Sequence, residues 1–214
     1  MKNRQSSLII LKSTHGRLPS YYCEIENRAA RGEEFVTSTA IAESLSINPI
    51  QVRKDLASIS SEPGRPNVGF RVNTLLEDLK VYLGYDHYDE AVLVGVGALG
   101  HVLLHYGGFA KYGLDIVAGF DTEPKEKKVG EKPVLPISKL GTFLKRTHIN
   151  IGIIAVPASE AQGVADMLVA GGAQAIWNFA PTTLNLPDNI LVKNENLAAS
   201  LAALTAELRR RRCF

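Results

Sequence analysis

The feature that most constrains this chain is a glycine-rich turn between a buried strand and a helix. An apolar run at residues 91–94 predicts the strand, and the next six residues are Gly95-Val96-Gly97-Ala98-Leu99-Gly100. In a dinucleotide-binding turn the first glycine permits the bend, the second admits the pyrophosphate, and the third lets helix and strand pack closely. Amides at the start of the helix then receive the phosphates. The pattern predicts a nucleotide site, although an α/β domain without a ligand can have the same glycine-rich turn.

An acidic residue in the expected place supports the nucleotide interpretation. Residues 115–120 predict a second strand that ends at Asp121, about 20 residues after the third glycine, where an acid binds the adenosine ribose hydroxyls. A carboxylate there repels a 2′-phosphate, so the sequence favours NAD(H) over NADP(H). Lys125, Lys127 and Lys128 weaken this argument because a lysine could reach a phosphate, and the alternative is a solvated run of charges.

Strands and helices continue to alternate after Asp121. Apolar runs at residues 151–156, 175–179 and 190–193 predict three more strands, with a helix at 159–170. The alternation is typical of a Rossmann-like, doubly wound parallel sheet, whose ligands lie at the carboxyl ends of the strands. The backbones at two such ends are predicted to line the nicotinamide half of a pocket, namely at Val156, Pro157, Asn178 and Ala180. The alternative is that prolines simply end these strands.

The front of the chain predicts helices around a tight turn. Residues 8–11 and 17–31 are expected to be helical, and capping residues precede two further helices at 40–45 and 50–59. A shared apolar core between the last two describes a helix-turn-helix. The expected core residues are Ile41, Leu45, Ile47, Val52 and Leu56.

The second helix of this pair is expected to present polar and basic side chains outward. A loop with the turn residues of a β-wing follows at residues 62–70. The predicted DNA-binding residues are Gln51, Arg53, Lys54, Ser58 and Arg65. The alternative is a small helical bundle with a solvated basic helix.

The chain ends in a predicted amphipathic helix at residues 196–212. Its leucines at 197, 201, 204 and 208 form a narrow apolar seam flanked by alanines, which suits packing on another helix or another subunit. The alternative is a helix lying on its own sheet. We therefore expect an α/β protein with a winged helix-turn-helix domain at residues 1–84, a Rossmann-like domain at 85–194 and a C-terminal helix at 195–214.

Composition excludes several classes of protein. Hydrophobic residues make up 45% of the chain, which argues against disorder, and the net charge of +2 says little about partners. No apolar run approaches the ~20 residues of a membrane span, and the first residues do not form a signal peptide. Cys23 and Cys213 lie far apart without neighbouring ligand residues, so we expect no disulfide, no metal site and a cytoplasmic location.

Catalytic machinery is not evident. A dehydrogenase needs a substrate domain and a proton donor near the nicotinamide, but the front of the chain predicts a helix-turn-helix and the histidines lack obvious carboxylate partners in sequence. We therefore expect a protein that is not an enzyme. The alternative is an NAD- or CoA-binding α/β subunit of a small oxidoreductase or ligase.

Taken in order, these motifs resemble the Rex family of redox-sensing transcriptional repressors. They cover nearly the whole chain, at residues 17–22, 52–56, 68–70, 95–100, 120–121, 128–130, 156–158, 161–162, 178–181 and 197. The resemblance implies a homodimer whose winged helices bind a palindromic operator when NAD+ is bound or NADH is scarce, and release it when NADH rises. It also implies that the C-terminal helix of each subunit swaps onto its partner.

The resemblance assigns roles to single residues and reveals departures. Arg53 and Lys54 match the family's recognition helix, and Tyr106 matches a tyrosine of its nicotinamide-dependent rearrangement. Many members carry an interdomain Arg–Asp ion pair that favours the DNA-binding state, at the positions of Cys23 and Asn196. This chain has neither charge, and its wing is less glycine-rich and less basic. The matching cofactor positions are Gly95, Gly97, Gly100 and Asp121, with Lys128 in a neighbouring matched motif.

Overall fold

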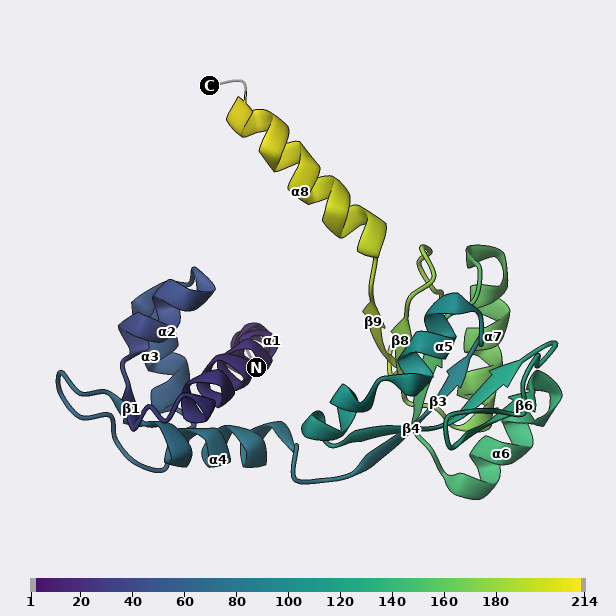
Figure 1. Cartoon of the computed structure of the whole chain (residues 1–214), viewed down its shortest axis with the longest axis horizontal. Coiled ribbons are helices and arrows are strands. Elements are labelled where there is room, and N and C mark those ends of the chain that lie inside the picture. The colour runs from purple at the N-terminus through teal and green to yellow at the C-terminus, as the bar shows by residue number, and fades with distance from the viewer. Residues whose placement is uncertain (1–2, 213–214) are drawn as a thin grey trace. The chain divides into compact units, whose positions relative to one another are not determined.

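The computed structural model describes the backbone of residues 3–212 and the side chains of residues 16–211. The chain divides into two compact units, Met1–His87 and Tyr88–Phe214, each with its own elements (Figure 1). The sequence placed the division after residue 84. Each unit is described by itself below.

The first unit begins with one long helix instead of the two predicted segments. Helix α1 runs from Asn3–Ala30 and continues through Pro19, which a sequence pattern would place at a helix start. The predicted helix-turn-helix follows as α2, Ser38–Leu45, and α3, Pro49–Ala57. Thr37 Oγ1 accepts from Ala40 N and Asn48 Oδ1 accepts from Ile50 N, so both predicted capping signals start helices.

The predicted wing loop leads into a two-stranded sheet, and a helix that the sequence did not predict follows it. Strand β1, Phe35–Val36, pairs antiparallel with β2, Phe70–Arg71, and the loop between α3 and β2 turns tightly where Arg65 and Gly69 form a bridge. Helix α4, Val72–Leu83, then closes the unit. Ile41, Val52 and Leu56 are fully buried as predicted, whereas Leu45 and Ile47 are half-buried.

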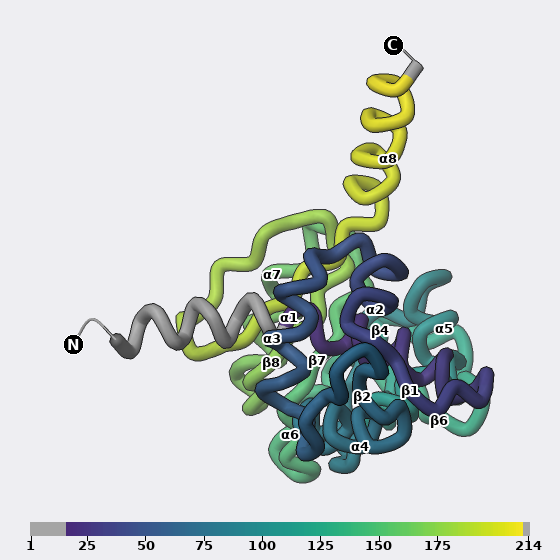
Figure 2. Tube along the Cα trace, turned by 90° about the vertical axis from the view of Figure 1, so that its left-hand side faces the viewer, coloured from purple at the N-terminus to yellow at the C-terminus, as the bar shows by residue number. Residues whose placement is uncertain are grey.

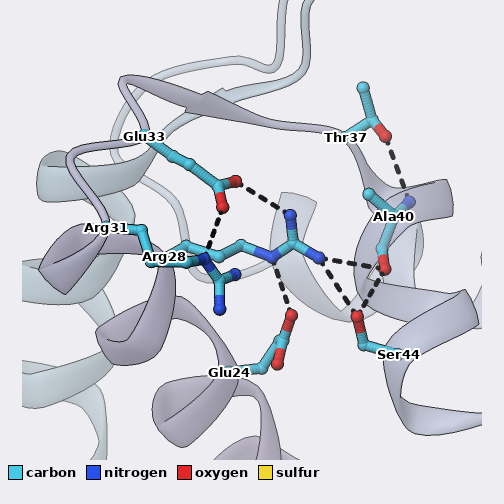
Figure 3. A network of polar contacts seen from close by, with 7 residues as sticks. All are labelled: Glu24, Arg28, Arg31, Glu33, Thr37, Ala40 and Ser44. Carbon is cyan, nitrogen blue, oxygen red and sulfur yellow. Dashed lines mark hydrogen bonds and ion pairs between the residues drawn. The ribbon is translucent and has the colours of Figure 1, made fainter.

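Arg28 connects the long helix to the helix-turn-helix (Figure 3). Its guanidinium donates to Glu24 at 2.7 Å, to Glu33 at 2.9 Å and to Ser44 Oγ at 3.1 Å, and also reaches the carbonyl of Ala40. These partners lie on α1, on the turn after it and on α2. One half-buried cation therefore fixes the first helix of the motif against α1.

The second unit is a seven-stranded sheet flanked by helices. Its elements are β3 (Asp89–Val94), α5 (Ala98–His105), the 3₁₀ helix η1 (Gly107–Tyr112), β4 (Leu114–Asp121), β5 (Lys128–Val129), β6 (Lys132–Pro136), the 3₁₀ helix η2 (Ile137–Lys139), α6 (Leu140–Thr147), β7 (Ile151–Ile154), α7 (Ala158–Gly171), β8 (Ala175–Asn178), β9 (Leu191–Asn194) and α8 (Leu197–Arg212).

The strand order is β5-β6-β4-β3-β7-β8-β9, and all neighbours are parallel except β5 and β6. The predicted doubly wound α/β sheet is therefore confirmed, with one correction: β5 makes an antiparallel edge. The order reverses at β3, whose neighbours β4 and β7 leave in opposite directions, and such a point is where open α/β sheets bind ligands.

Alternate residues of β3 face two separate apolar layers. Val92 and Val94 pack with Leu140 and Leu144 of α6 and with Leu168 of α7. Ala91 and Leu93 face the other side, where α5 contributes its buried leucines, Leu103 and Leu104. Burial on both faces explains why this strand is a continuous apolar run.

Helix α8 projects away from the sheet of its own unit (Figures 1 and 2). Its four seam leucines are all exposed, from 48% at Leu208 to 66% at Leu204. The alternative, in which this helix lies on its own sheet, is therefore wrong. In the described part of the chain, no helix combines the length and the apolar character that crossing a membrane requires.

Candidate nucleotide and DNA-binding sites

The glycine-rich turn connects β3 to α5 at the reversal point of the sheet. Gly95 has a φ of +96°, and a Cβ there would lie 2.6 Å from the carbonyl oxygen of Ala155 after β7. A Cβ on Gly100 would overlap the carbonyl oxygen of Gly95, whereas a Cβ on Gly97 would meet nothing within 4 Å. The first and third glycines therefore close the turn, and the second leaves its outer face open to a ligand.

Two clefts of about 230 and 260 Å³ lie beside this turn, and both are lined by Gly97 and Asp121. Val156 and Pro157 line the first. The second includes Lys125. An open glycine backbone, the uncapped start of α5 and a carboxylate at one edge form a cradle that suits a nucleotide diphosphate and its ribose.

Asp121 is already bonded to the turn, which sequence reasoning missed. Its Oδ2 accepts from the backbone N–H of Val96 at 2.8 Å, and its Oδ1 accepts from the N–H of Glu123 at 3.0 Å. A carboxylate offers about four acceptor positions, so this one can still accept from a sugar hydroxyl. Asp121 can therefore both hold the turn and receive a ribose.

Both polar atoms of the Asn178 side chain make hydrogen bonds within the second unit. It is fully buried, and its amide nitrogen donates to Asn194 Oδ1 at 2.9 Å and to the carbonyl of Thr182 at 3.0 Å. Its Oδ1 accepts from the N–H of Ala180 at 3.0 Å. Neither Asn178 nor Ala180 lines the two clefts, so their influence on a ligand would pass through the shape of this turn.

The other predicted cofactor and switch residues differ in whether they line the clefts. Lys128 lines neither cleft and its side chain is 62% exposed. Val96 and Ala98 line the second cleft, whereas Leu99 packs into the apolar layer under α5. Tyr106 ends α5 with an exposed ring that packs edge-on against Phe109.

Asn196 has a local role that its sequence did not reveal. Its Oδ1 accepts from the N–H of Ala199 at 2.9 Å, so it caps the N-terminus of α8. Cys23, its predicted partner position, is half-buried on α1 of the other unit.

The candidate DNA surface is helix α3. Arg53 and Lys54 are exposed as predicted, while the only acid of the helix, Asp55, is 3% exposed. Arg17 of α1 binds both oxygens of Asp55 at 2.9 and 3.1 Å, and the hydroxyl of Tyr21 donates to it at 3.0 Å. Arg17 thus neutralises the buried acid, and the exposed charges of α3 are all positive.

The same network changes the interpretation of two predicted contacts. Gln51 is half-buried, and its amide donates to Asp55 at 2.8 Å. The hydroxyl of Ser58 donates to the backbone carbonyl of Asp55 at 2.6 Å. Burial and the Asp55 hydrogen bond raise the pKa of Tyr21 to about 12.

Arg65 faces the same groove as Arg53. A groove of about 730 Å³ lies between the start of α2, the second half of α3 and the wing, and both arginines line it. The guanidinium carbons of Arg65 and Arg71 lie 5.2 and 5.1 Å from the centre of the Phe35 ring, within cation–π range. The wing arginine is therefore oriented by an aromatic ring rather than free.

Two family models match the chain. The model described as "CoA binding domain" matches residues 87–182, and the model described as "Putative DNA-binding protein N-terminus" matches residues 10–57.

Several relatives match most of the chain. One is a redox-sensing transcriptional repressor Rex of Carboxydothermus hydrogenoformans, 41% identical over 94% of this chain and 97% of its own length. A crystal structure of RSP with β-NAD+ and operator DNA covers 95% of this chain and 94% of that one, with 30% identity and a TM-score of 0.85. A structure of RSP with β-NADH is 29% identical over 94% of this chain and 95% of that one, also with a TM-score of 0.85.

Proposed function

The chain belongs to the Rex family of redox-sensing transcriptional repressors, and from this premise we propose that it binds a palindromic operator as a homodimer and leaves it when NADH is bound. The relatives are repressors rather than enzymes, so the alternative of an oxidoreductase or ligase subunit has no support from them. A repressor must reach the chromosome, which favours the cytoplasm. The exposed leucine seam of α8 favours a dimer through that helix.

The distribution of charge on α3 is the observation that supports DNA binding. Arg53 and Lys54 stand exposed on a helix whose one acid is buried and paired with Arg17. Phosphate contacts need such unopposed cations. We assign Arg53 and Lys54 to the operator, with Arg65 as the wing contact, whereas Gln51 and Ser58 act by holding α3 in place.

The residues that line the two clefts support the proposal that the protein binds NAD(H). Gly97 and the start of α5 would hold the diphosphate, and Asp121 the adenosine ribose. Val156 and Pro157 would border the bound molecule. Lys125 lines one of the clefts and could also contact it, whereas Lys128 lines neither cleft. The bound nicotinamide supplies the redox signal, and no bond is made or broken by the protein.

Release requires that the two states of the dimer differ in affinity for NADH. NADH can weaken operator binding only if the arrangement that cannot bind DNA binds it better. NAD+ must lack this preference. The free energy of the switch is therefore the difference between the NADH binding free energies of the two arrangements, and not the binding free energy of either one.

A gel-shift experiment tests the proposal. The operator is selected from a random DNA pool with the purified dimer, and NAD+ and NADH are then titrated separately into the complex. We expect a palindromic site and dissociation with NADH alone. A selected pool without a palindrome, or equal responses to both cofactors, would contradict the proposal.

A further inference from the structure

A row of aromatic rings runs along the second unit from Tyr106 to β8. The Tyr106 and Phe109 ring centres lie 4.9 Å apart and their planes meet at 75°. Phe109 and Trp177 follow at 5.6 Å and 82°. Both contacts are edge-to-face, the geometry that aromatic pairs prefer. Three elements, namely the end of α5, η1 and β8, are thereby joined by side chains that touch in sequence.

Trp177 packs on Phe179 as well, with ring centres 4.5 Å apart, and it is bonded to the base of the C-terminal helix. Trp177 Nε1 donates to Glu195 Oε1 at 3.3 Å, and the N–H of Glu195 donates to the carbonyl of Asn178 at 2.8 Å. The next residue, Asn196, caps α8. The direction in which α8 leaves the sheet therefore depends on a residue held by Trp177.

We propose that Phe109, Trp177 and Glu195 are positioning residues of the redox switch, which connect Tyr106 to the base of α8. This inference rests on the proposed function, because it takes Tyr106 as the residue that responds to the nicotinamide. Tyr106 is 55% exposed, so the core does not fix its ring, whereas Phe109 and Trp177 are half-buried. A displaced Tyr106 ring must be accommodated by Phe109, whose other side contacts Trp177. Close packing passes such a displacement on rather than absorbing it.

Two neighbouring glycines give a matched pair of variants for moving Tyr106. A Cβ on Gly108 would lie 2.5 Å from the hydroxyl oxygen of Tyr106, so Gly108→Ala must displace the free end of that ring. A Cβ on Gly107 meets nothing within 4 Å, so Gly107→Ala leaves the ring in place. Both glycines lie in η1.

The first test uses Trp177 as its own reporter, because it is the only tryptophan of the chain. Emission and acrylamide quenching are measured on the full-length dimer without cofactor, which avoids energy transfer to NADH. Gly108→Ala should shift the emission maximum and change the quenching, while Gly107→Ala should match the unmutated protein. Identical spectra for the two variants would overturn the connection between Tyr106 and Trp177.

The second test measures the coupling factor, which is the operator Kd with saturating NADH divided by the operator Kd without it. Trp177→Phe keeps a ring but removes the N–H, and Glu195→Ala removes the acceptor. Each should reduce a coupling factor of about 5–150 toward 1. In both variants the Kd for NADH and the operator Kd without NADH should each change less than twofold. Glu195→Gln retains an acceptor oxygen and should restore the coupling factor.

The outcomes separate this inference from the proposed function. If unmutated protein binds NADH but keeps its operator, the proposed function fails, and the emission comparison still decides whether Tyr106 reaches Trp177. If unmutated protein responds and both variants respond equally well, the positioning role is wrong. The double variant Trp177→Phe/Glu195→Ala should be no worse than Glu195→Ala alone, and additive losses would also overturn it.

Discussion

The backbone N–H of Val96 donates to Asp121 Oδ2 at 2.8 Å, so the carboxylate assigned to the ribose also ties the glycine-rich turn to the end of β4. The cofactor cleft is thus partly assembled before any ligand enters. It also means that deleting the side chain would remove two functions at once. Asparagine removes the charge and keeps one acceptor oxygen for Val96, although its amide nitrogen cannot accept from Glu123 as Oδ1 does.

Asp121→Asn should narrow the preference for NADH over NADPH. Two unit charges about 4 Å apart repel by roughly 1–4 kcal/mol at effective dielectric constants of about 80 to 20, and each 1.4 kcal/mol is about tenfold in Kd. We expect the ratio of the NADPH Kd to the NADH Kd to fall about tenfold or more, while the NADH Kd changes little. Asp121→Ala should weaken both cofactors, because the turn loses its acceptor. Equal affinities for NADH and NADPH in the unmutated protein would refute the ribose assignment.

Arg53→Ala and Lys54→Ala should each weaken operator binding without changing the NADH Kd. Loss of a phosphate contact should lower the salt slope of binding by about one, and loss of a base contact should cost ~1–3 kcal/mol and relax specificity. Anisotropy titrations at several salt concentrations distinguish these cases. Normal operator binding by both variants would mean that α3 does not contact DNA.

Arg17→Ala should destabilise the protein far more than Arg31→Ala. Arg17 pairs with a buried carboxylate, and removing it leaves Asp55 with fewer donors at a cost of ~1–3 kcal/mol. Arg31 is 56% exposed and pairs with Glu33, an arrangement that contributes only ~0–1 kcal/mol. Urea unfolding gives both values. A smaller effect at Arg17 than at Arg31 would contradict the buried-pair account of α3.

Tyr21 should make stability fall at alkaline pH. Its folded pKa, raised to about 12, exceeds the ordinary value of 10, so the folded state keeps a proton that the unfolded state loses. The contribution is fully present below about pH 10 and is lost as pH rises toward 12. Urea unfolding at pH 9 to 12 should show a shallower decline in Tyr21→Phe. An unchanged slope in that variant would place the alkaline loss elsewhere.

Restoring the two missing charges should strengthen the response to NAD+. A charge-assisted hydrogen bond contributes ~1.5–3 kcal/mol, comparable with a typical coupling energy of ~1–3 kcal/mol. We therefore expect NAD+ to enhance operator binding only weakly in the unmutated protein. Cys23→Arg combined with Asn196→Asp should increase this enhancement by more than the sum of the single changes.

The second of these substitutions carries its own control. Aspartate caps a helix as well as asparagine does, so Asn196→Asp should leave α8 intact, whereas Asn196→Ala should cost the cap about 1 kcal/mol. Strictly additive single changes in the double-mutant cycle would show that positions 23 and 196 do not meet.

The central strands and the turn of the nucleotide cleft could be predicted because their signals are local. Strand β3 is buried on both faces, and Gly95 and Gly100 each have a steric reason within the turn. Helices α4 and α6 lack such signals, since neither Arg71 nor Lys139 provides a side-chain cap at their starts. Packing on the rest of the unit stabilises these helices, and packing is not visible in a short window of sequence.

The polar networks were not predictable for a related reason. Arg17 and Asp55 are 38 positions apart, and Asn178 and Asn194 are 16 positions apart. Nothing in the sequence therefore singled out Asp55, and Asn178 was predicted only as a residue at a strand end. Their partners become evident once the chain has folded.

One titration tests the central claim most directly. The dimer is assembled on fluorescein-labelled operator, NADH is added, and anisotropy reports bound DNA while NADH fluorescence in the same cuvette reports bound cofactor. The account predicts that anisotropy falls to the value of free DNA as the cofactor sites fill, and that equal concentrations of NAD+ or NADPH leave the complex intact. Saturation of the sites with NADH while the DNA stays bound would contradict it.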